Sequence, residues 1–311
     1  MTRSAGVETL ISEAYEFLLK SDLASAQASF EKALEADFED EELLYSMKCA
    51  QWWADSITKA GMIQDHFEAG EYIINRWKAF KVFLDRLGSS YERAASAFKQ
   101  FAFGSALARY SRLAEDGESA DPEVILRLGR AYKGKGDYEA AVHQLEAASK
   151  AKRDDPAIMA ELADAYALID ESRASKALFR EAFFINPQQV DIDLLESSMY
   201  EKLAEKVTDY GKSGIEAAEW IPVLGELFGA FSVKRELKPV EAGKLKQSIY
   251  EMETELAADG SRRAILVPRL INRYFWLVDH YMNKKEERSK IDELLLKIKL
   301  LDPVVYKQYI A

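Results

Sequence analysis

The feature that most constrains this chain is a self-similarity at an offset of 34 residues between Pro122 and Arg180. Residues of the same kind recur at equivalent places in the two copies: Pro122/Pro156, Leu128/Leu162, Gly129/Ala163, Ala131/Ala165, Tyr132/Tyr166, Leu145/Phe179 and Ala148/Ala182. A fixed period of this length is typical of stacked helical hairpins, each of which buries its apolar face against its neighbours. Such arrays present surfaces to other molecules, so the period favours partner binding over chemistry.

The first copy, from Pro122 to about Asp155, has the spacing of two helices. Gly134 and Gly136 are expected to end the first helix, and Asp137 to begin the second. The inward positions are Ile125, Leu128, Gly129 and Tyr132 in the first helix and Ala141, Leu145 and Ala148 in the second. The small residues among them allow the two helix backbones to approach closely.

This pattern resembles the tetratricopeptide repeat family. The matching positions are Gly129, Tyr132, Ala141, Leu145 and Ala148 in one unit and Ala163, Tyr166, Ser175, Phe179, Ala182 and Pro187 in the next. Ser175 departs mildly from the small residue of the family. The resemblance implies an all-α, right-handed superhelical array of about five to seven antiparallel helix pairs. We expect the helices to be held by nearest-neighbour packing, so that no single distant pair dominates stability.

The resemblance is uneven along the chain. It extends to residues 7–38, where the matches are Ala14, Phe17, Leu23, Ala26, Phe30, Ala33 and Leu34. A looser fourth hairpin is expected over 88–121, with Ala95 and Phe98 in one helix and Ala106, Tyr110 and Leu113 in the next.

The domain organisation follows from where the period fails. We expect an array over 7–189 with an expanded second hairpin at 41–87. A divergent helical region would follow over 190–311, with a last hairpin at 264–303. Within the divergent region, Pro222 is expected to break an apolar helix.

Composition excludes several classes of protein. The net charge is −11 and no Lys/Arg block is long enough to follow a phosphate backbone, which argues against nucleic-acid binding. No apolar run is long enough to span a membrane, and residues 1–6 lack the apolar core of a signal peptide. We expect a cytoplasmic protein, or a periplasmic one if a leader has been removed.

No catalytic or metal-binding constellation is visible, so we predict a protein that is not an enzyme and has no cofactor. His66, His143 and His280 are far apart and have no metal-ligand spacing, and Cys49 is the sole cysteine. His143 is expected on the exposed side of its helix. No nucleophile with a neighbouring base can be named.

In the resembled family, the first helices line a concave groove that holds a peptide or a helix. That resemblance implies partner contacts from Glu123, Arg130, Lys133, Asp164 and Leu168. The same face carries Leu126, Gly134, Ala157, Ala160 and Ala167. The family's carboxylate clamp is not expected, because an acid stands at 164 where an asparagine is required.

Residues 41–110 are rich in aromatic side chains, including adjacent Trp52 and Trp53. Adjacent helical residues point about 100° apart, so one tryptophan is expected inside and the other outside. The cluster is either a bulky core or an aromatic groove, and both interpretations stay open from the sequence. The first favours a scaffold, whereas the second would suit a small apolar ligand in a protein associated with a membrane or transport system.

The segment 214–231 is too apolar for a free surface helix. We expect it to cover the open edge of the array, or alternatively to form a homo-oligomer interface. Taken together, the sequence predicts a non-catalytic scaffold or adaptor that binds a protein or peptide segment and supports assembly of a complex. A regulator that senses a peptide is a further alternative.

Overall fold

The computed structural model describes residues 4–88, 90–114 and 121–311. Residues 1–3 of the predicted leaderless terminus, and 89 and 115–120 of the predicted fourth hairpin, lie outside this description. All regular structure in the described residues is helical, and neighbouring helices pack in pairs, which confirms the all-α, solenoid-like fold class.

The chain divides into two compact units, Met1–Lys152 and Arg153–Ala311. This division falls inside the array predicted over 7–189. The boundary expected near 190 stays a prediction.

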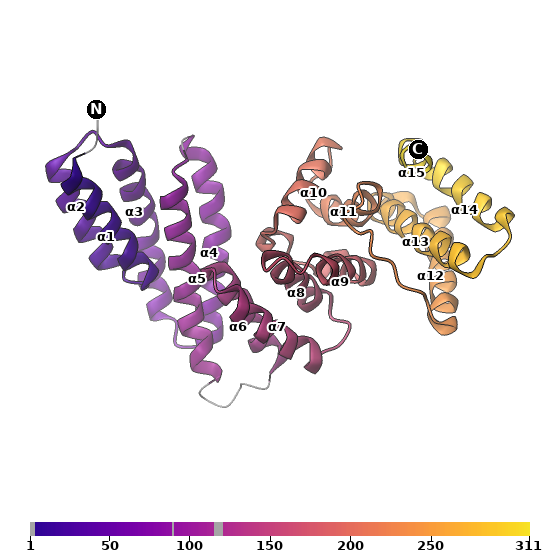
Figure 1. The fold of residues 1–311 in the computed structure, drawn as a ribbon, viewed down its shortest axis with the longest axis horizontal. Coiled ribbons are helices and arrows are strands. Elements are labelled where there is room, and N and C mark those ends of the chain that lie inside the picture. The colour runs from indigo at the N-terminus through magenta and orange to yellow at the C-terminus, as the bar shows by residue number, and fades with distance from the viewer. Residues whose placement is uncertain (1–3, 89, 115–120) are drawn as a thin grey trace. The chain divides into compact units, whose positions relative to one another are not determined.

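Unit 1 contains the first seven helices (Figure 1). They are α1 (Ala5–Leu19), α2 (Leu23–Ala36), α3 (Glu41–Met62), α4 (His66–Leu87), α5 (Glu92–Leu113), α6 (Pro122–Lys135) and α7 (Tyr138–Ala151). The pairs α1/α2 and α6/α7 are short hairpins. By contrast, α3, α4 and α5 are each 22 residues long, and α4 packs more extensively against α5 than against α3.

The hairpin predicted over 88–121 is wrong, because α5 is one continuous helix. The sequence between Glu92 and Leu113 offers a single turn residue, Gly104. That glycine lies inside the helix, where a β-carbon would come within 2.7 Å of the Ser21 hydroxyl oxygen. Gly104 therefore serves a close approach between elements, not a turn.

Helix α5 is the centre of unit 1. It contacts α1, α3, α4 and α6, and it buries residues all around its circumference, including Phe98, Phe101 and Phe103. The contact between α1 and α5 joins helices that are not neighbours in the sequence. This contact adds to the nearest-neighbour packing that was expected for the array.

Aspartates fix where many helices begin. The side chains that accept a backbone N–H at a helix N-terminus include Asp22, Asp40, Asp65, Asp121, Asp137, Asp155 and Asp302. Proline follows at the first helical position in α6, α8 (Pro156–Leu168) and α15 (Pro303–Ile310). The helix boundaries predicted at these Asp-Pro pairs are confirmed.

The two glycines at the end of α6 have different roles from those predicted. Gly136 adopts φ 93° and caps the helix, as expected. Gly134 lies inside α6, where a β-carbon would come within 2.3 Å of the Phe103 ring. It therefore allows α5 and α6 to pack closely and does not break the helix.

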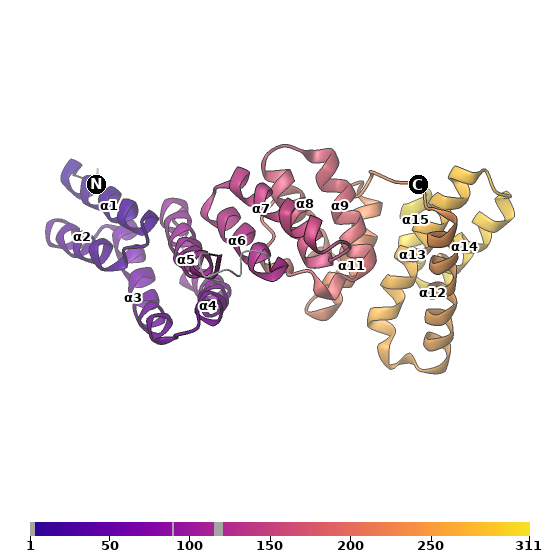
Figure 2. The same ribbon diagram turned by 90° about the horizontal axis from the view of Figure 1, so that it is seen from below.

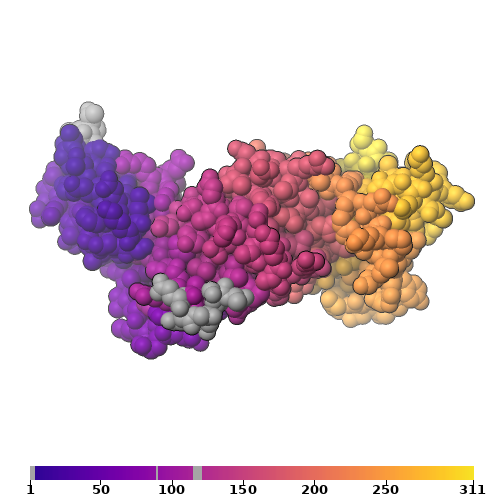
Figure 3. Space-filling model, turned by 60° about the horizontal axis from the view of Figure 1, so that its bottom comes forward, coloured from indigo at the N-terminus to yellow at the C-terminus, as the bar shows by residue number. Residues whose placement is uncertain are grey.

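Unit 2 begins with the hairpin α8/α9 and ends with a group of long helices. Its other elements are α9 (Ser172–Ile185), η2 (Pro187–Gln189), η3 (Ile192–Leu194), α10 (Ser198–Asp209), α11 (Ile215–Leu227), α12 (Pro239–Ala258), η4 (Gly260–Arg262), α13 (Arg263–Lys284) and α14 (Arg288–Leu301). Figure 2 shows α12 to α15 side by side, and in the space-filling view of Figure 3 their orange and yellow atoms are contiguous. Helix α13 contacts α11, α12 and α14.

Helix α11 is the segment whose apolar character stood out in the sequence. Pro222 lies inside it and does not end it, so the predicted break is wrong. The helix packs against α9, α10 and α13, and its buried acid Glu219 is paired with Arg269 at 2.6 Å. Only residues at its ends, Ile215 and Phe228, are large apolar side chains with substantial exposure. This burial agrees with a covering role, while a role in oligomerisation stays a prediction.

A cluster of four charges ties the segment after α11 to the helices beneath it. Arg180 on α9 donates to Asp279 on α13 at 2.6 Å and lies 3.5 Å from Glu226. Lys234 contacts the same two acids at 2.7 and 2.5 Å. The two cations and two anions neutralise one another at a largely buried position.

Candidate functional site

The three charged side chains expected at the centre of a partner-binding face are buried. Arg130 is 6 %, Lys133 1 % and Asp164 0 % exposed. Each of them has polar interactions inside the protein. A role in partner binding for these residues stays a prediction, and their burial means that a partner would first meet the surface around them.

Asp164 has a clear structural task. Its two carboxylate oxygens accept the backbone N–H groups of Glu196 and Ser197, each at 2.9 Å. Ser197 precedes the first residue of α10, so the acid fixes the start of that helix. This arrangement uses both oxygens of a carboxylate, which explains why an acid suits this position better than an amide.

Glu123 lies at the edge of a charged network in unit 1. It accepts from Arg127 at 2.8 Å and from Lys152 at 3.0 Å. Arg127 also reaches Glu71 on α4 at 3.2 Å, and Tyr110 on α5 donates to Glu71 at 2.6 Å. This network links α4, α5 and α6. Burial alone would raise the pKa of Glu71, but hydrogen bonds from Tyr110 and Arg127 outweigh it and lower that pKa.

The two adjacent tryptophans differ in exposure as predicted. Trp53 is 0 % exposed, and its ring lies 5.5 Å from those of Phe80 and Phe101. Trp52 is half-buried beneath the guanidinium of Arg76, which lies 4.1 Å from its ring. The aromatic side chains of this region largely pack against one another, so the core interpretation is the one that the structure supports.

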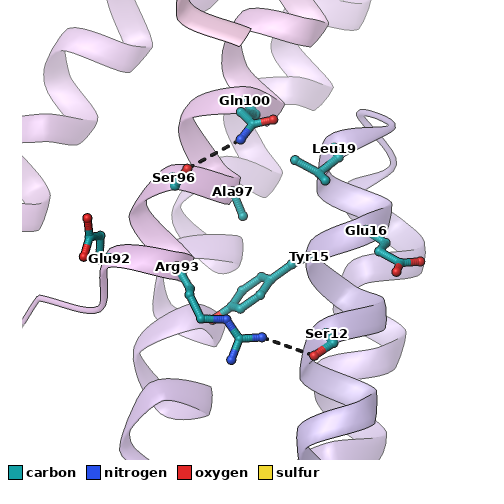
Figure 4. Close-up of a pocket in the computed structure, with 9 residues that line it drawn as sticks. All are labelled: Ser12, Tyr15, Glu16, Leu19, Glu92, Arg93, Ser96, Ala97 and Gln100. Carbon is teal, nitrogen blue, oxygen red and sulfur yellow. Dashed lines mark hydrogen bonds between the residues drawn. The ribbon is translucent and has the colours of Figure 1, made fainter. Parts of the chain in front are cut away.

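A groove in unit 1 lies elsewhere, between α1 and α5, and has a volume of about 550 Å³. It is lined by Ser12, Tyr15, Glu16 and Leu19 from α1 and by Glu92, Arg93, Ser96, Ala97 and Gln100 from α5. In Figure 4, Tyr15 and Leu19 on α1 point toward Arg93 and Ala97 on α5, whereas the side chains of Glu16 and Glu92 project outward from the two helices. The spacing on each helix is that of a single helical face, and serine and alanine keep the space open.

Polar contacts fix the positions of the Tyr15 and Arg93 side chains. The Tyr15 hydroxyl donates to Glu42 at 2.9 Å and is hydrogen-bonded to Ser46 at 2.8 Å, and burial raises its pKa above the ordinary value. Arg93 forms an ion pair with Glu8 at 2.8 Å and lies 5.4 Å from the Tyr15 ring. The groove therefore has a rigid apolar floor.

The remaining charge on the groove is negative. Glu8 compensates Arg93, whereas Glu16 and Glu92 are exposed and form no ion pair with any residue that the structure describes. Two uncompensated carboxylates next to an apolar floor favour a ligand that carries both a basic and an apolar group.

Sequence reasoning did not identify this groove. The two faces belong to helices far apart in the chain, and Arg93 falls in the range that was assigned to a hairpin. The available signal was that Ser12, Ser96 and Gln100 are polar or small, whereas the inner stripes of the repeats are apolar.

The histidines show no sign of a metal site. His143 is exposed, as predicted, and within the described ranges no three His, Cys, Asp or Glu side chains are grouped as metal ligands would be. In the same part of the chain, no helix combines the length and apolar character that crossing a bilayer requires.

Comparison with known families gives one finding. Residues 122–155, which form the hairpin α6/α7, match the family described as Tetratricopeptide repeat. The chain contains a tetratricopeptide repeat (TPR). The matched TPR is the unit from which the 34-residue period was first measured, and α8/α9 repeats its architecture. Among curated proteins, none matches this chain. TPRs generally mediate protein–protein interaction and the assembly of complexes.

Proposed function

We propose that this TPR-containing protein is a non-catalytic scaffold that binds a segment of a partner protein in the groove between α1 and α5. The observation that carries the proposal is the groove itself, which combines an apolar floor with two uncompensated carboxylates at its rim. Glu123, Leu168 and Trp52 retain some exposed surface and remain predicted secondary contacts. A cytoplasmic location remains part of the proposal.

The groove fits a short piece of chain. From Ser12 to Leu19, α1 rises by about 10 Å, which accommodates about three residues of an extended segment. The floor of Tyr15 and Ala97 would contact an apolar side chain, and Glu16 and Glu92 would pair with lysine or arginine. We therefore propose a partner segment that places one apolar residue beside one or two basic residues.

The test is quantitative affinity capture with matched variants. Ser96→Trp fills the groove from an exposed position on α5, and Ala28→Trp adds the same side chain at an exposed position on α2. Partners that bind in the groove should be lost with Ser96→Trp and kept with Ala28→Trp. A charge-reversed Glu16→Lys/Glu92→Lys variant should lose the same set.

The binding regions of the partners kept with Ala28→Trp and lost with Ser96→Trp are then mapped to peptides, and the binding of these peptides is measured by fluorescence anisotropy. A basic–apolar peptide should bind about tenfold or more weakly to the charge-reversed variant. If every captured partner binds Ser96→Trp as well as it binds the wild type, the groove is not the binding site.

A further inference from the structure

Unit 2 contains a second hollow, separate from the proposed partner groove. It lies between α9, α12 and α13 and encloses about 370 Å³. Its apolar walls come from Phe184, Ile185, Leu237 and Leu245, and two arginines, Arg235 and Arg273 of α13, belong to the same lining. Charged side chains surround these apolar walls, and the question is which of the charges lack a partner.

Arg273 is partly buried and forms no ion pair with an acid of the described residues. Its Nε donates to the Ser248 hydroxyl at 3.2 Å, and its guanidinium lies 5.4 Å from the Phe184 ring. No carboxylate among the described residues forms an ion pair with it. Desolvation, with a contribution from the nearby charge of Arg269, lowers the pKa of Arg273 to about 10. A guanidinium has five N–H donors, and only one of these is used here.

The neighbouring acids are already engaged. Arg269, one turn away on α13, forms an ion pair with Glu219, with 2.6 Å between the guanidinium nitrogen and the carboxylate oxygen. On the other side of the hollow, Arg235 pairs with Glu241 at 2.9 Å and also with Glu181. Glu219, Glu181 and Glu241 thus pair with cations other than Arg273.

Two further charges lie at the rim. Lys244 is exposed and forms no ion pair with the residues that the structure describes, and Asp154 is an exposed acid on the opposite side. The lining therefore carries three cations, Arg235, Lys244 and Arg273, and three acids, Asp154, Glu181 and Glu241, and Lys244 and Arg273 are the two cations without an ion pair among the described residues. An anion placed beside Arg273 would pair with a cation that forms no ion pair with a carboxylate of the described residues.

We propose that this hollow binds a small carboxylate with an apolar body, whose carboxylate contacts Arg273 and whose body lies against Phe184, Ile185 and Leu245. The planar guanidinium matches a carboxylate with two parallel hydrogen bonds, and pairing there is strengthened by the exclusion of water. The volume equals about a dozen water-sized volumes, which suits a ligand of roughly ten heavy atoms. A phosphate alone would leave the apolar walls without a contact.

The probe is octanoate, titrated into the full chain by isothermal calorimetry, with 1-octanol and octylamine as matched compounds. We expect octanoate to bind and the neutral and cationic analogues to bind about tenfold or more weakly. Equal binding of octanol would overturn the assignment of an anion site.

Two variants locate the site. Arg273→Met removes the charge with little change in length, and Arg288→Met is the control on exposed surface of α14. Octanoate binding should fall about tenfold or more in the first and stay unchanged in the second. If Arg273→Met does not fold by circular dichroism, Ile185→Trp fills the hollow from a partly exposed position, 38 % accessible, and should abolish binding. Unchanged binding in Ile185→Trp overturns the proposal.

A peptide that ends in leucine has the same chemistry as the proposed ligand. Comparing the free C-terminal acid with its amide, in competition with octanoate, distinguishes the sources. Octanoate bound more tightly than the free acid supports a small molecule, and the reverse order overturns that part of the proposal. Failure here would leave the groove between α1 and α5 untouched, because that test uses variants in unit 1.

Discussion

Substituting alanine for Gly129 tests how tightly the two helices of the matched TPR are packed. Gly129 lies in α6, where a β-carbon would come within 2.5 Å of Leu145 Cγ and 2.8 Å of its Cδ2. Leu145 is 0 % exposed. Its Cγ is the branch atom bonded to Cβ, so the clash is not relieved by moving the tip of a flexible side chain.

Two effects of opposite sign decide the outcome. Alanine inside a helix is favoured over glycine by about 1 kcal/mol. Overpacking a well-filled core costs about 1–3 kcal/mol. Because the contact is far shorter than an ordinary van der Waals distance, we expect the cost to lie in the upper part of that range. Gly129→Ala should therefore destabilise the α6/α7 hairpin by about 1–2 kcal/mol.

The measurement is native-state hydrogen exchange of the full chain, followed by mass spectrometry of peptides from α6 and α7. A local readout is needed because the helical pairs of an array open separately. The control is Gly243→Ala in α12, where no atom lies within 4 Å of the added carbon. That variant should gain up to about 1 kcal/mol in its own segment.

The decisive comparison uses Leu145→Ala as a background. Removing the leucine side chain costs about 2–5 kcal/mol by itself, but it also removes the clash. Gly129→Ala should then stabilise the hairpin by about 1 kcal/mol, a reversal of sign. If the substitution has the same effect in both backgrounds, close packing is not the reason for glycine at this position.

Three other perturbations have definite expected outcomes. Glu71→Gln should cost about 1–3 kcal/mol at pH 7. The folded pKa of Glu71 lies below its ordinary value of 4.5, so this stabilisation is present above pH 4.5 and is lost as the pH falls through the folded pKa. The urea midpoints of the wild type and of Glu71→Gln should therefore converge between pH 7 and pH 3. Asp164→Asn leaves one backbone N–H without an acceptor, and exchange at the start of α10 should accelerate, corresponding to about 1–3 kcal/mol; unchanged exchange would contradict the capping role. Trp53→Ala should cost about 3–5 kcal/mol and Trp52→Ala less than half as much, judged from urea midpoints; equal losses would count against their different burial.

The local rules of helix formation made much of the fold predictable. Asp121 and Asp155 predict the starts of α6 and α8. An aspartate followed by proline favours a helix start because the aspartate accepts a free backbone N–H group and proline needs no acceptor. The small residues Gly129 and Ala163 predict hairpins whose two helices pack closely, because the distance between packed helices depends on side-chain size. These signals act over a few residues and do not depend on how the other helices of the chain are arranged.

The candidate site depends on information that local patterns lack. The groove exists because α1 lies against α5, and no periodicity in either helix specifies that contact. Arg130 and Lys133 have the sequence pattern of an exposed basic face, but long cationic side chains can be buried when the interior supplies polar partners. Arg273 gave no sequence signal at all, since its character comes from the acids that pair with other cations.

The contact between α1 and α5 has a consequence for synthesis on the ribosome. Helix α1 is complete about 70 residues before α5 begins. At typical elongation rates of about 5–20 residues per second, the interval lasts roughly 4 to 15 seconds. During that time, α1 has α2 as a neighbour but lacks its contacts with α5, such as that between Tyr15 and Arg93. The nascent N-terminal hairpin thus presents an apolar surface to chaperones until the central helix of unit 1 emerges, and the whole unit completes its folding late for an array built of local hairpins.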